Sequence, residues 1–240
     1  MEHFSDRIVY MMHDDDTDQP YVYYIKGDRL SLQIDAGNSP ASYSRFQKGL
    51  SELGLKTPDL LVLTHWHWDH TFGLRDCLCP VISSEKTREY LEKVMTWKWD
   101  DDSFKERLAT GEDIEFCYER MHVEYQDLEK EISVRSSDIW FEGKMTVDLG
   151  GITAEFETMD TPHTRDALMI YVPEEKALFG GDAEYEDYYD NDSQYDPQRL
   201  KAFIDYLEAK DFNYYMRGHD DTCITKSELL KKLGESLSLL

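Results

Sequence analysis

Histidine and aspartate side chains recur in the sequence where predicted strands end. His65, His67, Asp69 and His70 form the first group and directly follow a short apolar run at 60–63. On a helix, residues two positions apart point to different sides, whereas on an extended chain they project to one side. We therefore expect an extended lead-in on which His65, His67 and Asp69 face the same way, followed by a turn that brings His70 round. Imidazole nitrogens and carboxylate oxygens are ligands that zinc accepts at about 2.0–2.2 Å.

Three further candidate ligands follow predicted strands in the same way. They are His163 after a strand at 152–159, Asp182 after a strand at 177–179, and His219 after a strand at 212–216. Strand ends on one edge of a sandwich can bring residues distant in sequence into one pocket. The pattern therefore predicts a single metal centre assembled from the whole chain.

The elements that must position these residues fall into two β-rich halves. In the first half we expect a hairpin over 21–34, a helix from Ser39-Pro40 and a strand at 60–63, followed by a helical stretch. In the second half we expect a hairpin over 145–159 and strands at 167–172 and 177–179. A helix from 197, a strand at 212–216 and a final helix capped by Thr225 and Glu228 complete the order. Two sheet layers flanked by helices account for this order. No linker divides the chain, so we expect one α+β domain spanning 1–240.

The helical stretch at 84–138 has the character of an insertion. Thr110 and Asp113 are placed like a capping box, and apolar residues at spacings of three and four from Ile114 to Ile132 predict one long helix. Such a helix either packs on the body or forms a lid over the active site. Trp97 and Trp99 are the residues of this stretch that we would first expect to contact substrate.

Composition narrows the range of partners. Fifty acidic residues against 26 basic ones give a net charge of -24, and no local basic patch offsets it, so we expect no nucleic-acid partner. No apolar run approaches the roughly 20 residues of a spanning helix, and we expect neither a signal peptide nor a membrane partner. The four cysteines do not form a disulfide framework. We therefore expect a cytoplasmic protein that acts on a small molecule, with its oligomeric state left open.

The motifs together resemble those of the metallo-β-lactamase-fold hydrolases. The matching residues are the cluster His65-x-His67-x-Asp69-His70, His163 in Thr-Pro-His-Thr, Asp182 in Gly-Gly-Asp, Gly218-His219, and Asp35 in Asp-Ala-Gly. The resemblance covers residues 20 to 220. It implies a four-layer αβ/βα sandwich with the metal site at one edge of the two sheets.

The resemblance also implies a role for each residue. His65, His67 and His163 would hold one metal ion, Asp69, His70 and His219 would hold a second, and Asp182 would bridge the two. Asp35 would orient the histidine cluster through hydrogen bonds without binding metal.

The implied cofactor is a pair of zinc ions about 3.5–4 Å apart, with a bridging hydroxide that attacks the substrate. Zinc is favoured because the related di-iron enzymes have glutamate where this chain has His67, although iron and manganese accept the same ligands. Asp69 would then shuttle a proton to the leaving group.

The expected activity is hydrolysis of a small ester, lactone, thioester or amide. The alternatives left open are a β-lactamase, a mononuclear iron oxidoreductase resembling the persulfide dioxygenases, and a non-catalytic metal-binding scaffold. Tyr185 stands three residues after Asp182, as in lactonases of the family, where its phenol could contact a carbonyl oxygen. Arg165 is a candidate for binding a substrate carboxylate. Against this, the loop 182–196 has seven carboxylates and no lysine or arginine, so at the pocket rim it would disfavour strongly anionic substrates.

Overall fold

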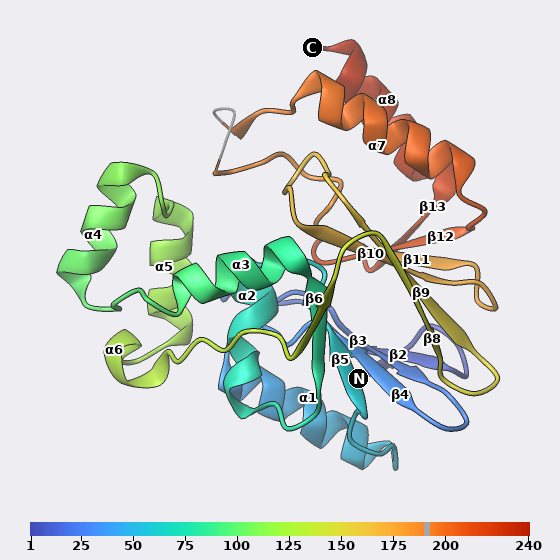
Figure 1. The fold of residues 1–240 in the computed structure, drawn as a ribbon, viewed down its shortest axis with the longest axis horizontal. Helices are drawn as coiled ribbons and strands as arrows, with labels where there is room; N and C mark the ends of the chain where they lie inside the picture. The colour runs from blue at the N-terminus through green and yellow to red at the C-terminus, as the bar shows by residue number, and fades with distance from the viewer. Residues whose placement is uncertain (190–192) are drawn as a thin grey trace.

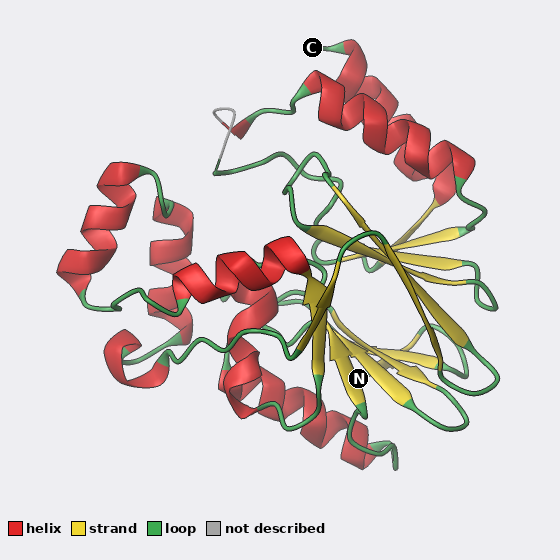
Figure 2. Ribbon diagram, viewed as in Figure 1, coloured by secondary structure: helices red, strands yellow, loops and turns green. Residues whose placement is uncertain are grey.

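The two halves of the chain form two sheets that pack face to face. The computed structural model describes residues 1–189 and 193–240. Helices cover the outer face of each sheet, so the layers run helix, sheet, sheet, helix (Figure 1). The same view coloured by secondary structure separates the two sheets from their covering helices (Figure 2). The predicted α+β sandwich is therefore confirmed.

The first sheet contains seven strands in chain order. They are β1 (Glu2–His3), β2 (Ile8–Met11), β3 (Val22–Lys26), β4 (Ser31–Ile34), β5 (Leu60–Val62), β6 (Val81–Ser84) and β7 (Ile139–Phe141). The strands from β4 to β7 run parallel, and helices connect them. These helices are α1 (Pro40–Glu52), α2 (Trp68–Thr71), the 3-10 helix η1 (Phe72–Asp76) and α3 (Glu85–Val94). The Ser39 hydroxyl caps α1 by accepting a hydrogen bond from the Ser42 amide, as its sequence predicts.

The second sheet contains six strands in the order β13-β12-β11-β10-β9-β8. Their bounds are β8 (Lys144–Asp148), β9 (Thr153–Met159), β10 (Ala167–Val172), β11 (Ala177–Gly181), β12 (Tyr214–Arg217) and β13 (Cys223–Thr225). Its outer face is covered by α7 (Pro197–Ala209) and α8 (Lys226–Ser238), and Thr225 and Glu228 form a capping box at the start of α8. Within the described residues, no helix combines the length and apolar character needed to cross a bilayer.

Alternating side chains explain how each sheet is buried on both faces. Along β10, Leu168, Ile170 and Val172 enter the core between the sheets, whereas Met169 and Tyr171 pack against the helical layer. Successive side chains of a strand point to opposite faces, so a strand covered on both sides must be apolar throughout. The six consecutive buried residues of β10 meet that requirement.

The insertion is helical, but its long helix is broken. It contains α4 (Asp101–Thr110), α5 (Glu115–Glu124) and α6 (Leu128–Glu131), which extend to one side of the sandwich (Figure 1). Thr110 ends α4 instead of capping α5, and Tyr125 is extended, so the predicted single helix is wrong. The apolar residues of the predicted stripe nevertheless share one core cluster, because the break folds them inward over two short helices.

Candidate metal centre

The carboxyl ends of neighbouring strands deliver the candidate ligands to one edge of the sandwich. Asp35 directly follows β4, the 65–70 segment follows β5, Asp182 directly follows β11, and His219 lies two residues after β12. Because β4 pairs with β5 in parallel, and β11 with β12, the ends lie at one edge within each sheet. The two edges meet, since Asp69 and His70 from the first sheet lie close to Asp182 and His219 from the second. His163 reaches that edge from the connection between β9 and β10.

Two groups of ligand atoms result. His65, His67 and His163 each place one ring nitrogen within 4.8 Å of the others. The closest approach joins His163 Nε2 to His67 Nδ1 at 3.0 Å. All three side chains are buried.

The second group combines Asp69, His70, Asp182 and His219, again with one ligand atom each within 4.8 Å. Asp69 Oδ2 lies 3.0 Å from His70 Nε2 and 3.1 Å from His219 Nε2. Asp182 Oδ2 lies 3.3 Å from His70 Nε2 and 3.9 Å from His163 Nε2. Asp182 therefore stands between the two groups, where a bridging ligand would have to be.

A short helix divides the histidine motif between the groups. The chain is extended at His67, with φ -56° and ψ 149°, and α2 begins at Trp68. Asp69 and His70 consequently lie in a helical turn and not on the extended segment that we predicted for Asp69. The change of direction explains why His65 and His67 join one group while Asp69 and His70 join the other.

Hydrogen bonds outside the two groups hold the rings in place. Asp35 Oδ2 lies 2.7 Å from His70 Nδ1, and the Asp35 carboxylate also accepts hydrogen bonds from the amide and hydroxyl of Thr64. Asp35 adopts a left-handed conformation at φ 61° to reach this position. His163 Nδ1 lies 2.7 Å from the carbonyl oxygen of Glu186. Such outer partners fix ring orientation and leave the opposite nitrogen free to bind metal.

The electrostatics of the two groups differ. Burial lowers the pKa of His65 and His67, and neighbouring histidines lower it further. Both rings are therefore neutral, which is the form in which an imidazole nitrogen binds a metal ion. Burial alone would raise the pKa of Asp69 and Asp182, but His70 and His219 outweigh it and keep both carboxylates ionised. Burial alone would lower the pKa of His70 and His219, but Asp69 and Asp182 outweigh it and raise both values, that of His219 to about 9. Without a metal ion the second group therefore pairs two carboxylates with two imidazolium rings, and a bound cation would replace their ring protons.

Two buried polar atoms support a metal-binding role. His65 Nε2 and Asp182 Oδ1 have no hydrogen-bond partner among the described residues, although a buried unpaired polar atom costs about 1–3 kcal/mol. Gly218 leaves space beside Asp182, since a Cβ there would lie 2.0 Å from Asp182 Oδ1. The nitrogen and oxygen donor set is one that zinc accepts. The residues present therefore fit a metal ion.

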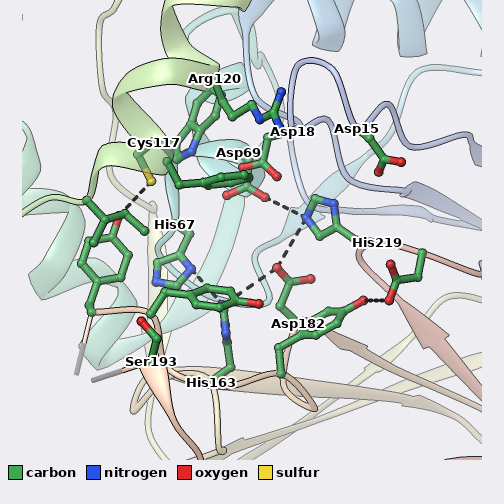
Figure 3. Close-up of a pocket in the computed structure, with 17 residues that line it drawn as sticks. Asp15, Asp18, His67, Asp69, Cys117, Arg120, His163, Asp182, Ser193 and His219 are labelled. Carbon is green, nitrogen blue, oxygen red and sulfur yellow. Dashed lines mark hydrogen bonds and ion pairs between the residues drawn. The ribbon is translucent and has the colours of Figure 1, made fainter. Parts of the chain in front are cut away.

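A pocket of about 590 Å³ opens over both groups (Figure 3). Residues of the two groups form part of its lining: His67, Asp69, His163, Asp182 and His219. Aromatic side chains form other walls, namely Trp68, Phe116, Tyr185, Tyr188 and Tyr189. The remaining polar lining residues include Asp15, Asp18, Arg120 and Asp220.

The predicted substrate contacts are not all placed in this pocket. Tyr185 lines it, but Trp97 and Arg165 line a separate hollow of about 260 Å³ that shares His67 and Tyr189 with the first. Trp99 is 8% exposed within the core of the insertion, beneath the Arg107 guanidinium, and lines neither hollow.

Sequence analysis missed several pocket residues. Asp15 and Asp18 come from the acidic N-terminal run at 14–18, and their only sequence signal is that run. Ile114 and Cys117 show that the insertion forms part of the pocket wall. Three residues of the predicted acidic loop 182–196, at 190–192, lie outside the described residues.

Comparisons with known proteins agree with this geometry. The family model described as the metallo-beta-lactamase superfamily matches residues 15–225. Among solved structures, a metallo-beta-lactamase from Pontibacter korlensis is 17% identical with a TM-score of 0.67 over 99% of this chain and 98% of that chain. A metallo-beta-lactamase family protein from Thermus thermophilus is 15% identical with a TM-score of 0.68 over 99% and 80%. An archaeal superfamily protein from Sulfolobus tokodaii is 18% identical with a TM-score of 0.61 over 96% and 86%. No curated protein sequence matches the chain significantly.

Proposed function

The chain belongs to the metallo-beta-lactamase superfamily, and on that premise we propose that it is a dinuclear metal-dependent hydrolase of a small ester, lactone, thioester or amide. The observation that carries the proposal is that two groups of candidate metal ligands lie together under one pocket. The first group is His65, His67 and His163, and the second is Asp69, His70, Asp182 and His219.

The two groups would each hold one metal ion, with Asp182 shared between them. Paired divalent ions supply a water nucleophile at neutral pH and a Lewis acid for the substrate carbonyl. Zinc is the metal we propose, because neutral imidazoles and carboxylates suit it, and iron and manganese are the competitors. The chain's own contribution is to hold the ligand rings through Asp35 and the Glu186 carbonyl.

Asp69 is the residue we propose to carry the proton. Its Oδ2 atom lies within about 3 Å of ring nitrogens of both His70 and His219 and faces the pocket, so it could pass a proton from the nucleophile to the leaving group. The burial of Asp69, at 4% exposure, keeps competing bulk water away from this carboxylate.

The pocket walls favour a small, uncharged acyl compound. Aromatic side chains supply apolar contact area, and Asp15 adds negative charge on the wall, so a strongly anionic substrate would be repelled. Burial and the nearby Asp69 raise the pKa of Asp18 well above its ordinary value, which favours its neutral form. Arg120 offsets part of this charge, which leaves room for polar but uncharged groups.

Metal analysis and a substrate panel test the proposal. We expect about two zinc ions per chain and turnover of at least one ester, lactone, thioester or amide by the loaded protein. His67→Ala should lose metal and lower kcat/KM by more than about 100-fold, since removing even an outer partner of a ligand costs 10–100-fold. His3→Ala, on the exposed strand β1, is the matched control.

Other outcomes would redirect the proposal. Efficient nitrocefin turnover would identify a β-lactamase. One iron per chain with oxygen uptake would identify the oxidoreductase alternative. Bound metal without turnover of any substrate would leave a non-catalytic scaffold.

A further inference from the structure

Three tyrosines line the pocket above the donor groups, and two of their hydroxyls are already engaged. The Tyr189 hydroxyl lies 3.3 Å from Cys117 Sγ. The Tyr185 hydroxyl donates to Asp220 Oδ2 at 2.9 Å and accepts from Arg217 Nη2 at 2.9 Å. Tyr185 could therefore donate to a substrate only by giving up its bond to the Asp220 carboxylate.

Tyr188 differs from both. Its side chain is 44% exposed, and its ring stands edge-on to the His163 ring, with centroids 5.8 Å apart and an interplanar angle of 83°. Its hydroxyl makes no hydrogen bond to any of the described residues, and the residue lines the pocket beside a candidate metal ligand. A hydrogen bond from this group to a substrate would replace one to water and would break no hydrogen bond to the described part of the chain.

We propose that Tyr188, and not Tyr185, donates the hydrogen bond to the carbonyl oxygen of the acyl substrate. The inference rests on the proposed hydrolase function and names one residue that would recognise its substrate. Hydrogen bonds to charged groups are stronger than those between neutral groups, so the pairing of Tyr185 with Asp220 and Arg217 competes well against a neutral carbonyl. The fourth tyrosine of the loop, Tyr195, is also engaged, because its hydroxyl donates to the backbone carbonyl of Glu184. Tyr188 is therefore the tyrosine of this loop whose hydroxyl has no partner among the described residues.

Three tyrosine-to-phenylalanine variants separate these roles, because each removes only a hydroxyl. Tyr188→Phe and Tyr185→Phe test the two candidates. Tyr214→Phe is the control, since Tyr214 is 40% exposed on β12, packs against Phe4 and lies outside the pocket lining. Each zinc-loaded protein is assayed with p-nitrophenyl acetate and δ-valerolactone, and its melting temperature is recorded.

A second readout does not depend on turnover. Binding of δ-valerolactam, a cyclic amide with the same ring carbonyl, is followed by saturation-transfer NMR. If the wild-type protein hydrolyses neither substrate, the hydrolase proposal fails for these classes, whereas lactam binding still ranks the three variants.

We expect Tyr188→Phe to lower kcat/KM about 10-fold and to weaken lactam binding by a similar factor, without changing the melting temperature. We expect Tyr185→Phe to lower the melting temperature by about 2–4 °C, through loss of its bonds to Asp220 and Arg217, with a smaller loss of kcat/KM than Tyr188→Phe. The inference is overturned if Tyr188→Phe matches the Tyr214→Phe control in both turnover and lactam binding, or if Tyr185→Phe shows the larger kinetic loss.

Discussion

Breaking the buried ion pair between Glu184 and Arg217 should destabilise the protein by about 3–5 kcal/mol. Glu184 lies two residues after Asp182 and Arg217 two residues before His219, so the pair joins the loops that carry two candidate ligands. Arg217 Nε lies 2.6 Å from Glu184 Oε1, and the Tyr215 hydroxyl donates to the other carboxylate oxygen at 2.9 Å. Glu184 is 0% exposed and Arg217 is 3% exposed.

The expected magnitude follows from that burial. Glu184→Gln preserves volume and an acceptor oxygen but removes the buried counter-charge of the Arg217 guanidinium. The Asp220 carboxylate, 2.9 Å from Arg217 Nη2, remains, but its side chain is 59% exposed and its charge is screened, so the loss stays close to the costly case for a buried pair. Glu92→Gln is the matched control, because Arg88 and Glu92 also approach to 2.6 Å but keep 29% and 47% of their side chains exposed. An exposed pair of this kind contributes about 0–1 kcal/mol.

Urea denaturation of five metal-loaded proteins measures the difference: wild type, Glu184→Gln, Glu92→Gln, Arg217→Met and the double variant Glu184→Gln/Arg217→Met. The zinc content of each protein is also measured, because displacement of the loops that carry Asp182 and His219 should lower the affinity of the second ligand group for metal. In the double variant Glu184→Gln/Arg217→Met the uncompensated charge is gone. Its free energy of unfolding should therefore fall by about 2 kcal/mol less than the sum of the decreases in the two single variants. A Glu184→Gln cost no larger than that of Glu92→Gln would refute the reasoning, as would strictly additive single losses.

Two further substitutions test the surroundings of the centre. Asp35→Asn should weaken metal binding about 10–100-fold, because an amide cannot accept hydrogen bonds from Thr64 and His70 together as the carboxylate does. Metal titration measures the affinity, and an unchanged affinity would contradict the role of Asp35. Burial raises the pKa of Asp166 to about 6, despite hydrogen bonds from Thr164 and Thr87 that lower it. The protonated form is therefore favoured in the folded state, and its stabilising contribution is present near pH 4 and lost as pH rises through 6. Urea unfolding should show Asp166→Asn gaining about 2–3 kcal/mol relative to wild type between pH 4 and pH 8, and a pH-independent difference would contradict the assignment.

Local signals in the sequence were sufficient for much of the fold. The Lys26-Gly27-Asp28 turn predicts the hairpin of β3 and β4, and Ser39-Pro40 predicts the start of α1. Each is a short-range pattern whose physical cause lies within a few residues. The seven candidate ligands could be anticipated to meet for a related reason: each follows a predicted strand, and strand ends share an edge.

Features that depend on tertiary contacts were not predictable. The edge strands β7 and β13 are three residues each, too short to show alternation. The break between α5 and α6 is invisible to periodicity, because Tyr125 continues the apolar spacing while its backbone is extended. Tyr185 and Tyr189 find hydroxyl partners in Asp220 and Cys117, which are distant in sequence, so no spacing rule could distinguish them from Tyr188.

The candidate centre and its pocket are built from different parts of the molecule. Most of the donor residues are placed at the ends of strands whose side chains pack in the core between the sheets, so their positions are held by the scaffold. Much of the pocket wall comes instead from segments outside both sheets: the acidic run at 14–18, helix α5, and the loop that contains Tyr185 and Tyr188. Substitutions of pocket-lining side chains in those segments can alter charge and shape at the wall without moving the metal ligands, provided that they spare Glu184 and the backbone at Glu186, which hold those ligands. If the chain has the proposed hydrolase activity, we expect the strand ends to set its chemistry and the wall to set its choice of substrate, so that a wall substitution such as Tyr188→Phe should change substrate recognition without changing metal binding.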